Sequence, residues 1–290
     1  MIFLQNCSVL CGLLIKSCIT ILKICLLSRF FVTSRKSALH KKCIILGNGP
    51  SLHESIGSAD NLNEYDLFAV NYFAQSDLFT QVKPRFYVIL APEIWQESPM
   101  QKVKKERDAL FSIIKNVNWE MYFYIPFFAK KSDFWKPLFC EHPCIKIIYF
   151  NATPVEGLRT INYYLYKRNL GMPRPHNVLT PCLMFAIAQK YEEVYLFGAD
   201  HSWLKDIWVS DANEVLLTQK HFYDMATAKP LPMQNYKENK TRSLHEILHK
   251  FMLAFASYFE INAYAKSQNV RIINATPQSY IDAFERGRIV

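Results

Sequence analysis

A glycine-rich turn in "CIILGNGPSL", residues 43 to 52, is the part of the sequence best suited to chemistry. Gly47 and Gly49 permit a tight turn and let a ligand approach the backbone closely. Pro50 suits the first position of a helix, and the unpaired N–H groups of a first helical turn bind anions. The turn therefore predicts a phosphate-bearing ligand, with an ordinary tight turn between strand and helix as the alternative.

Two well-known nucleotide motifs do not fit this turn. Leu52 stands where the dinucleotide motif G-x-G-x-x-G requires its third glycine. The G-K-[ST] sequence of a Walker A loop is also missing after the turn. The pattern predicts a phosphate without specifying the nucleotide.

Polar residues follow three other apolar runs. Asn71 comes after "DLFAV", "APEIW" comes after "FYVIL", and Gly198 and Asp200 come after "EVYLF". Ligands of open α/β sheets bind at the carboxyl ends of the strands. We expect these residues to share one crevice with the glycine-rich turn, the alternative being loop solvation or helix capping.

A second motif, "HEILH" at residues 245 to 249, has the spacing H-E-x-x-H. On a helix this spacing places two imidazoles one turn apart, as in zinc hydrolases, which also need a third ligand. Glu260 follows His249 on the same expected helix, about 16 Å further along the axis and too far to bind the same metal. Three interpretations stay open: a zinc site, incidental histidines on an amphipathic helix, or a catalytic His245. We expect no metal and no cofactor.

Short apolar β-rich runs alternate with amphipathic stretches along the chain. This alternation predicts an α/β fold, a Rossmann-like and mainly parallel sheet with helices on both faces. The expected strands are Cys43–Leu46, Leu67–Val70, Phe86–Leu90, Met121–Ile125, Ile145–Phe150, Glu193–Phe197 and Val270–Ile273. The expected helices are Pro50–Ile56, Met100–Val117, Pro154–Asn169, Pro181–Lys190, Asn213–Ala226, Leu244–Gln268 and Pro277–Arg286.

Three Thr-Pro pairs coincide with expected helix starts. Thr153, Thr180 and Thr276 each precede a proline, and Glu156 completes a capping box with Thr153. Residues 227 to 243 are polar and proline-punctuated, with neither helical nor strand periodicity. We expect a lid at about residues 201–243 within a domain that spans residues 41–290.

Residues 1–40 are apolar and basic. The first 42 residues hold seven lysines and arginines and no acid, so most of the +9 net charge lies there and nucleic acid is not an expected partner. Lys16 and Lys23 interrupt the apolar run, so neither piece reaches the roughly 18 to 20 residues of a spanning helix. Both lysines fall on one helical face, which predicts an anchor in the plane of a membrane surface.

The cysteines and the basic tail together predict a cytoplasmic location. Four of the eight cysteines lie in the tail, and the others show no paired spacing, which fits a reducing compartment. We expect a protein on the inner face of the membrane. A start codon assigned too early is the alternative interpretation of the tail.

Several segments resemble the bacterial sialyltransferases of glycosyltransferase family 42. They are "KKCIILGNGPSL", "LFAVNYF", "CLMFAIAQKYEEVYLFGAD" and the late helix that precedes "VRIINATP". The resemblance, over roughly residues 41 to 284, implies a nucleotide-sugar fold with a lid, no metal, inversion at the sugar carbon, and a histidine base, His245. It also implies contacts with the cytidine monophosphate (CMP) part of the donor from Asn48, Gly49, Ser51 and Asn71, with Gly198 and Asp200 beside the nucleotide.

The sequence departs from the family in three places. The Thr-Ser-Gly turn that helps hold the donor falls near "HNVLTP", which makes Asn177 and Thr180 candidates. Pro92 stands in place of an asparagine turn. The tyrosines that steady the leaving phosphate have no clear counterpart, with Ser202, Tyr223 or Tyr236 at the nearest positions.

The expected function is transfer of sialic acid or a related sugar from a CMP-activated donor to a surface glycan or lipid-linked acceptor. A phosphate- or pyrophosphate-transferring enzyme and a non-catalytic nucleotide-binding protein of a surface-polysaccharide pathway are the alternatives. A related family of phosphate-transferring or flagellin-modification proteins shares the start "GxGPSL", and this motivates the first alternative. A homo-oligomer is a further expectation.

Overall fold

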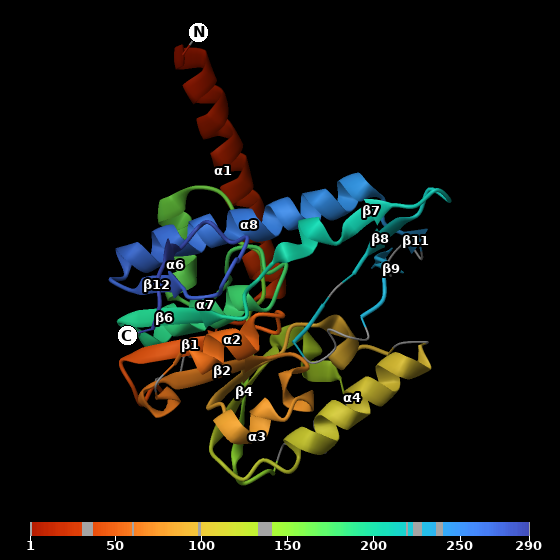
Figure 1. The fold of residues 1–290 in the computed structure, drawn as a ribbon. Coiled ribbons are helices and arrows are strands. Elements are labelled where there is room, and N and C mark those ends of the chain that lie inside the picture. Colours follow the sequence, from red (N-terminus) through yellow and green to blue (C-terminus); the bar gives the residue numbers. More distant parts are fainter. Residues whose placement is uncertain are drawn as a thin grey trace.

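The computed structural model has an α/β fold built on an eight-stranded sheet with the order β13-β12-β6-β1-β2-β3-β4-β5 (Figure 1). Every neighbouring pair in this sheet is parallel. The structure describes residues 2–289 apart from 31–36, 60, 98–99, 133–140, 219, 223–227 and 236–239. The expectation of a Rossmann-like, mainly parallel sheet is confirmed.

All seven expected strands are present, with ends shifted by two residues at most. The central sheet comprises β1 (Lys42–Leu46), β2 (Asp66–Val70), β3 (Phe86–Val88), β4 (Met121–Pro126), β5 (Ile145–Phe150), β6 (Glu193–Phe197), β12 (Arg271–Asn274) and β13 (Glu285–Arg286). Runs of consecutive apolar residues form these strands because both sheet faces are covered.

Helices cover both faces of the sheet (Figure 1). Alternate strand residues enter two cores: Ile45 belongs to the core that contains Tyr258 of α8, and Ile44 to the core that contains Leu110 of α4. One face carries α6 (Arg159–Lys167), α7 (Leu179–Gln189) and α8 (Leu244–Ser267), and the other carries α2 (Leu52–Gly57), α3 (Leu78–Val82) and α4 (Gln101–Ile114). Single 3-10 turns are η1 (Leu62–Glu64), η2 (Phe73–Gln75), η3 (Pro92–Ile94), η4 (Phe127–Lys131) and η5 (Ser202–Lys205).

The helix expected at Pro154 begins five residues later, at Arg159. The backbone around Pro154 is extended, because Thr153 and Val155 exchange hydrogen bonds with Met172 instead of starting a helix. The Thr153 hydroxyl lies 2.7 Å from the hydroxyl of Ser28. It therefore caps no helix.

The helix expected over Pro277–Arg286 is absent, and turns and bends lead the chain to β13. The Thr276 hydroxyl donates to the Leu196 carbonyl (3.0 Å) and accepts the Ala199 N–H (3.0 Å). These bonds to the end of β6 replace the predicted cap. At the third Thr-Pro pair, α7 begins at Leu179, so Thr180 lies inside the helix and is fully buried.

A small antiparallel sheet replaces the helix expected over Asn213–Ala226. It comprises β7 (Ile207–Val209), β8 (Val215–Leu217) and β9 (Leu231–Pro232), and a second pair joins β10 (Gln234–Asn235) and β11 (Lys240–Thr241). Asn213 has φ of +60° in the β7–β8 turn. These strands occupy the expected lid, and Leu217 packs against Ile247 and Phe251 of α8.

The N-terminal helix α1 (Ile2–Leu27) projects from the domain in Figure 1. Its segment from Cys7 to Leu27 is long and apolar enough to cross a membrane, by length and composition. The helix continues through Lys16 and Lys23, so the two lysines do not limit its length. The expected orientation in the plane of a membrane surface stays a prediction. The second half of α1 packs on the domain, where Ser17, Thr20, Ile24 and Ser28 are buried.

Candidate functional site

The sheet order changes direction between β1 and β6. From β1 the chain adds β2 to β5 on one side, then returns to place β6 and β12 on the other. Crevices at such switch points, outside the carboxyl ends of the strands, are where ligands bind in open α/β sheets. The turn after β1 and the turn after β6 meet here, as expected from the sequence.

Backbone hydrogen bonds join these two turns. The Gly47 N–H donates to the Phe197 carbonyl and the Gly49 N–H to the Gly198 carbonyl, both at 2.8 Å. A Cβ on Gly49 would lie 1.9 Å from Oδ2 of Asp200. Gly198 has φ of +60°, and a Cβ there would lie 2.6 Å from the Gly47 carbonyl. The glycines thus allow the two turns to pack together.

Asp200 occupies the place that the sequence predicted for an anion. Its carboxylate accepts the Ser51 N–H (3.2 Å) and the Ser51 hydroxyl (2.9 Å). The next N–H, of Leu52, donates to the Gly49 carbonyl (3.2 Å). The N–H groups of Ser51 and Leu52, which the sequence predicted to be free, are therefore engaged within the protein. Burial raises the pKa of Asp200, and the hydrogen bonds from Ser51 oppose that rise.

Asn48 connects the turn to the lid and to β2. Its carbonyl accepts the Phe222 N–H (3.0 Å), and its Nδ2 donates to the Val70 carbonyl (3.3 Å). Its Oδ1 is buried and has no hydrogen-bond partner among the described residues. A buried acceptor without a partner is costly, so this oxygen suits a hydroxyl or amino group of a ligand.

Asn71 braces the ends of β2 and β3. Its φ of +46° is a conformation that asparagine tolerates better than most residues. Its Oδ1 accepts the N–H groups of Leu90 (2.9 Å) and Ala91 (3.2 Å), and its carbonyl accepts the Tyr87 hydroxyl. The Oδ1 of Asn71 is thus engaged by the protein.

His201 links this edge to α8. The centroid of its ring lies 4.1 Å from the ring centroid of Trp203, and its Nε2 is 2.6 Å from the Tyr258 hydroxyl. Burial lowers the pKa of His201 to about 3, so the ring is neutral at physiological pH. Burial raises the pKa of Tyr258, and the nearby Asn177 side chain, whose Nδ2 has no hydrogen-bond partner among the described residues, opposes that rise. The Oδ1 of Asn177 accepts the Leu179 N–H at the start of α7 (2.9 Å).

A group of basic residues lies where the segment before α7, the end of the lid and the start of α8 meet, and we name it the basic cluster. Its members come from the segment before α7, the end of the lid and the second turn of α8: Arg174, His176, Arg242, His249 and Lys250. Met233 of the lid connects two of them, because its carbonyl accepts the Arg242 N–H (2.8 Å) and its sulfur lies 4.0 Å from the Lys250 ammonium. Ser257 of α8 donates to the Arg174 carbonyl (2.9 Å).

The basic cluster has more cations than anions. Arg174 is paired with Glu156 at 2.7 Å, whereas Arg242 and Lys250 have no ion pair within the described part of the chain. Burial, and then Arg174, Lys250 and His249, lower the pKa of His176 to about 4. Burial and Arg242 lower the pKa of Lys250. Nε2 of His176 and Nε of Arg242 are buried without partners among the described residues. This arrangement is suited to binding an anion.

The sequence analysis missed the basic cluster. Its members come from three segments, "PRPH", "TRS" and "LHK", none of which is a motif. Only the return of α8 and the lid to the α7 side brings them together. The nearest signal was the excess of basic residues just before α8.

His245 lies on the first turn of α8 and is exposed, with Nδ1 3.0 Å from the Ser243 hydroxyl. No hydrogen bond joins it to the turns after β1 and β6 within the described residues. Glu246 accepts the Ser243 N–H (2.8 Å) and hydroxyl (2.9 Å) in a capping box, and these bonds lower its pKa. Among the residues described, no group of three potential metal ligands is found.

The remaining expected positions have mixed outcomes. The Thr180 hydroxyl is buried without a partner in the described structure, Ser202 opens η5, and Pro92 opens η3. Tyr223 and Tyr236 lie outside the described residues.

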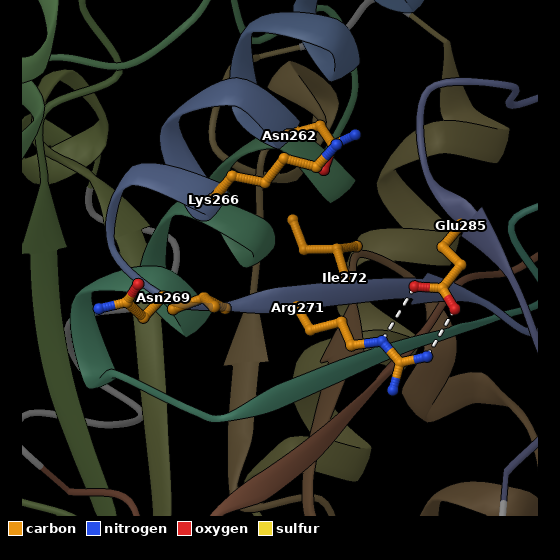
Figure 2. Close-up of a pocket in the computed structure, with 7 residues that line it drawn as sticks. Asn262, Lys266, Asn269, Arg271, Ile272 and Glu285 are labelled. Carbon is orange, nitrogen blue, oxygen red and sulfur yellow. Dashed lines mark hydrogen bonds and ion pairs between the residues drawn. The ribbon is translucent and has the colours of Figure 1, made fainter.

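A cavity of about 250 Å³ lies at the other end of the sheet (Figure 2). It is lined by the start of β12 and the end of α8, and in Figure 2 Arg271 and Glu285 form an ion pair across it. Because it opens at the amino end of β12, it is separate from the switch point.

No protein-family model and no curated protein matches the chain. Among solved structures, the chain is similar to the structure of the MAf glycosyltransferase from Magnetospirillum magneticum AMB-1, with a TM-score of 0.48 and 13% identity over 87% of this chain. The chain spans 34% of the length of that protein. A likeness this distant carries no argument about activity.

Proposed function

We propose that the chain is a glycosyltransferase that binds a nucleotide-sugar donor at the β1–β6 switch point. The observation that carries the proposal is the basic cluster, two of whose cations lack ion-pair partners in the described structure. His201 of the switch-point edge contacts Tyr258 of α8, the helix that also carries His249 and Lys250 of this cluster. A nucleotide sugar carries negative charge on its phosphate, which lies between an uncharged nucleoside and the sugar. The switch-point edge therefore suits the uncharged nucleoside, and the basic cluster suits the phosphate.

The donor we propose is a CMP-activated sialic acid or a related sugar, following the sequence resemblance. Asn48, with its unpartnered Oδ1, would accept a hydrogen bond from the nucleoside, and Gly49, Ser51, Asn71, Gly198 and Asp200 would border it. Because Asp200 occupies the Ser51 N–H, the donor phosphate would be held by Arg242 and Lys250 instead. Asn177 and Thr180 stay candidates for donor contacts.

In the proposed reaction, an acceptor hydroxyl attacks the anomeric carbon of the donor sugar. The new bond forms between the acceptor oxygen and this carbon, while the bond to the phosphate oxygen breaks and inverts the configuration. His245 takes the proton of the hydroxyl, and CMP leaves with the bonding electrons. A neutral imidazole is suited to this step near pH 7. Arg242 and Lys250 would stabilise the charge that grows on the phosphate.

Activity measurements on His245→Ala and His249→Ala test the base. The first should lower turnover by about 10² to 10⁴-fold with donor affinity nearly unchanged, and the second should have little effect. A stoichiometric zinc ion that both variants lose would contradict the proposal, because two imidazoles would then hold a metal.

Calorimetric titration with CMP tests the basic cluster. Lys250→Met and Arg242→Gln should each weaken binding about 10-fold at low salt, the effect expected of one charge-assisted bond. Lys266→Met, at the other end of α8, is the matched control and should bind CMP normally. Equal affinity in all four proteins would remove the cluster from the site.

Two alternatives remain for the same site. A pyrophosphate-transferring enzyme would consume a nucleoside triphosphate with a divalent ion, and a binding protein of a polysaccharide pathway would bind nucleotide without turnover. Product analysis with CMP-sugars and with nucleoside triphosphates separates these three outcomes. The acceptor, a glycan or a lipid-linked glycan, is identified in the same assay.

A further inference from the structure

Helix α1 contacts the domain through hydroxyl groups. The Ser17 hydroxyl accepts the Leu158 N–H (2.8 Å), and the Thr20 hydroxyl donates to the Glu156 carbonyl (2.7 Å) and accepts its N–H (3.0 Å). The Ser28 hydroxyl donates to the Leu170 carbonyl (2.6 Å). We call Ser17, Thr20 and Ser28 the hydroxyl seam.

The opposite side of α1 is aliphatic. Ile15, Ile19, Leu22 and Leu26 repeat at spacings of four, three and four residues, so they form one stripe, which faces away from the seam at 100° per residue. Their exposed fractions are 61, 46, 59 and 73%. We call these four residues the outer stripe.

This polarity is the reverse of that on an ordinary surface helix, which buries its apolar face and exposes its polar face. On the domain side of α1, three hydroxyl groups are buried together with Ile24, whereas the large aliphatic groups of the outer stripe are exposed. Such an arrangement is stable only where the surroundings of the outer stripe are themselves apolar.

We propose that the outer stripe lies in a lipid bilayer and that the hydroxyl seam fixes α1 rigidly to the domain. The helix is then a mount that sets the orientation of the domain on the membrane, rather than an anchor joined by a flexible linker. The proposal does not depend on the glycosyltransferase assignment.

A bilayer fits α1 better than a second copy of the chain. A helix that pairs with another helix needs one narrow apolar seam, whereas Val9, Leu10 and Leu14 are also exposed, outside the outer stripe. The projecting half of α1 is therefore apolar on several sides. The first 42 residues are also basic with no acid, which favours anionic lipids.

The backbone of the domain is shaped to receive α1. Gly157 has φ of +125°, and a Cβ on it would lie 2.3 Å from Oγ of Ser17. A Cβ on Gly171 would meet Val155 (2.5 Å) and the Thr153 carbonyl (2.6 Å) of the domain before Ile24 of α1 (3.2 Å). The close approach at Gly157 requires the helix to be seated, which supports a fixed mount over a loose tail.

Co-sedimentation of the full chain with vesicles of phosphatidylcholine and phosphatidylglycerol tests the outer stripe. Leu22→Glu with Leu26→Glu should lower the bound fraction at least 10-fold, because the two carboxylates would enter hydrocarbon. The matched control is Ser17→Ala with Thr20→Val, which should bind vesicles as the wild type does. Near-UV circular dichroism confirms that each variant is folded.

The mount is tested by the orientation of the bound domain. A fluorophore is placed on the domain and a quencher in the lipid headgroups. The wild type should give a narrow distribution of fluorophore–quencher distances, and the seam variant, Ser17→Ala with Thr20→Val, a broad one. Undiminished vesicle binding by the Glu double variant would overturn the lipid assignment. So would a wild-type dimer in detergent that cross-links through Cys18 or Cys25. Equal distributions for wild type and seam variant would overturn the mount.

Discussion

Replacement of Asp200 by alanine should both destabilise the protein and reveal the anion site that its carboxylate fills. The carboxylate accepts two hydrogen bonds from Ser51, at 3.2 and 2.9 Å. Hydrogen bonds to a charged group contribute roughly 1.5–3 kcal/mol each. Burial raises the pKa of Asp200, so desolvation of the carboxylate outweighs these two bonds. The net loss of about 2 kcal/mol that we expect therefore comes from the Ser51 N–H and hydroxyl, which would lose their acceptor.

The expected loss converts to a small but measurable thermal shift. The unfolding entropy of 290 residues is about 0.6 kcal/mol/K, so about 2 kcal/mol lowers Tm by roughly 3 °C. Asp200→Asn retains an acceptor and should lose about half as much. Differential scanning fluorimetry in mild detergent measures both shifts.

The same variants decide what Asp200 does to a ligand. Without the carboxylate, the Ser51 N–H and hydroxyl become available and a negative charge is removed, so CMP should bind a few-fold more tightly to Asp200→Ala. If Asp200 instead contacts the donor directly, as the family resemblance implies, affinity falls. An alanine variant that unfolds at the wild-type temperature and binds CMP less well would refute both the stabilising and the anion-blocking role of the carboxylate.

Three further outcomes are expected. Gly198→Ala should unfold several degrees below the wild type in fluorimetry, because φ of +60° is strained for alanine and its Cβ would lie 2.6 Å from the Gly47 carbonyl; Gly12→Ala, on open α1 surface, is the control and should not lose stability. Unfolding free energy should be full above about pH 6.5 and fall as the pH approaches 4, because the unfolded chain takes up a proton that buried His176 refuses, and His176→Gln should flatten part of this slope in denaturant titrations. Ser243→Ala should cost about 1 kcal/mol through loss of the α8 cap, and unchanged stability would show that Glu246 caps the helix alone.

The strands were predictable from sequence because both faces of the sheet are covered. Runs such as "IKIIYF" in β5 carry that signal in themselves. The long helices α4 and α8 were predictable from their periodicity. The formation of these strands and helices is determined by residues close together in the sequence.

The helix starts predicted at Thr153 and Thr276 were wrong because they depend on residues far away in the sequence. Thr153 and Thr276 have the right local sequence for a cap, but distant groups engage their hydroxyls, Ser28 in one case and Leu196 in the other. In the site, the meeting of Gly49 with Asp200 followed from strand order. The sequence did not predict that the Asp200 carboxylate fills the anion position. That outcome depends on the side-chain geometry of Ser51 and Asp200, which are 149 residues apart in the chain.

The placement of β1 in the middle of the sheet has a consequence for synthesis. Its second partner, β6, begins at Glu193, so nearly 150 residues separate the two strands in the chain. At roughly 5–20 residues per second, the ribosome leaves that edge of β1 without its partner for about 8–30 s. An unpaired apolar strand edge invites association with other chains. The nascent protein therefore needs shielding, by a chaperone or by the membrane, until residue 197 has emerged.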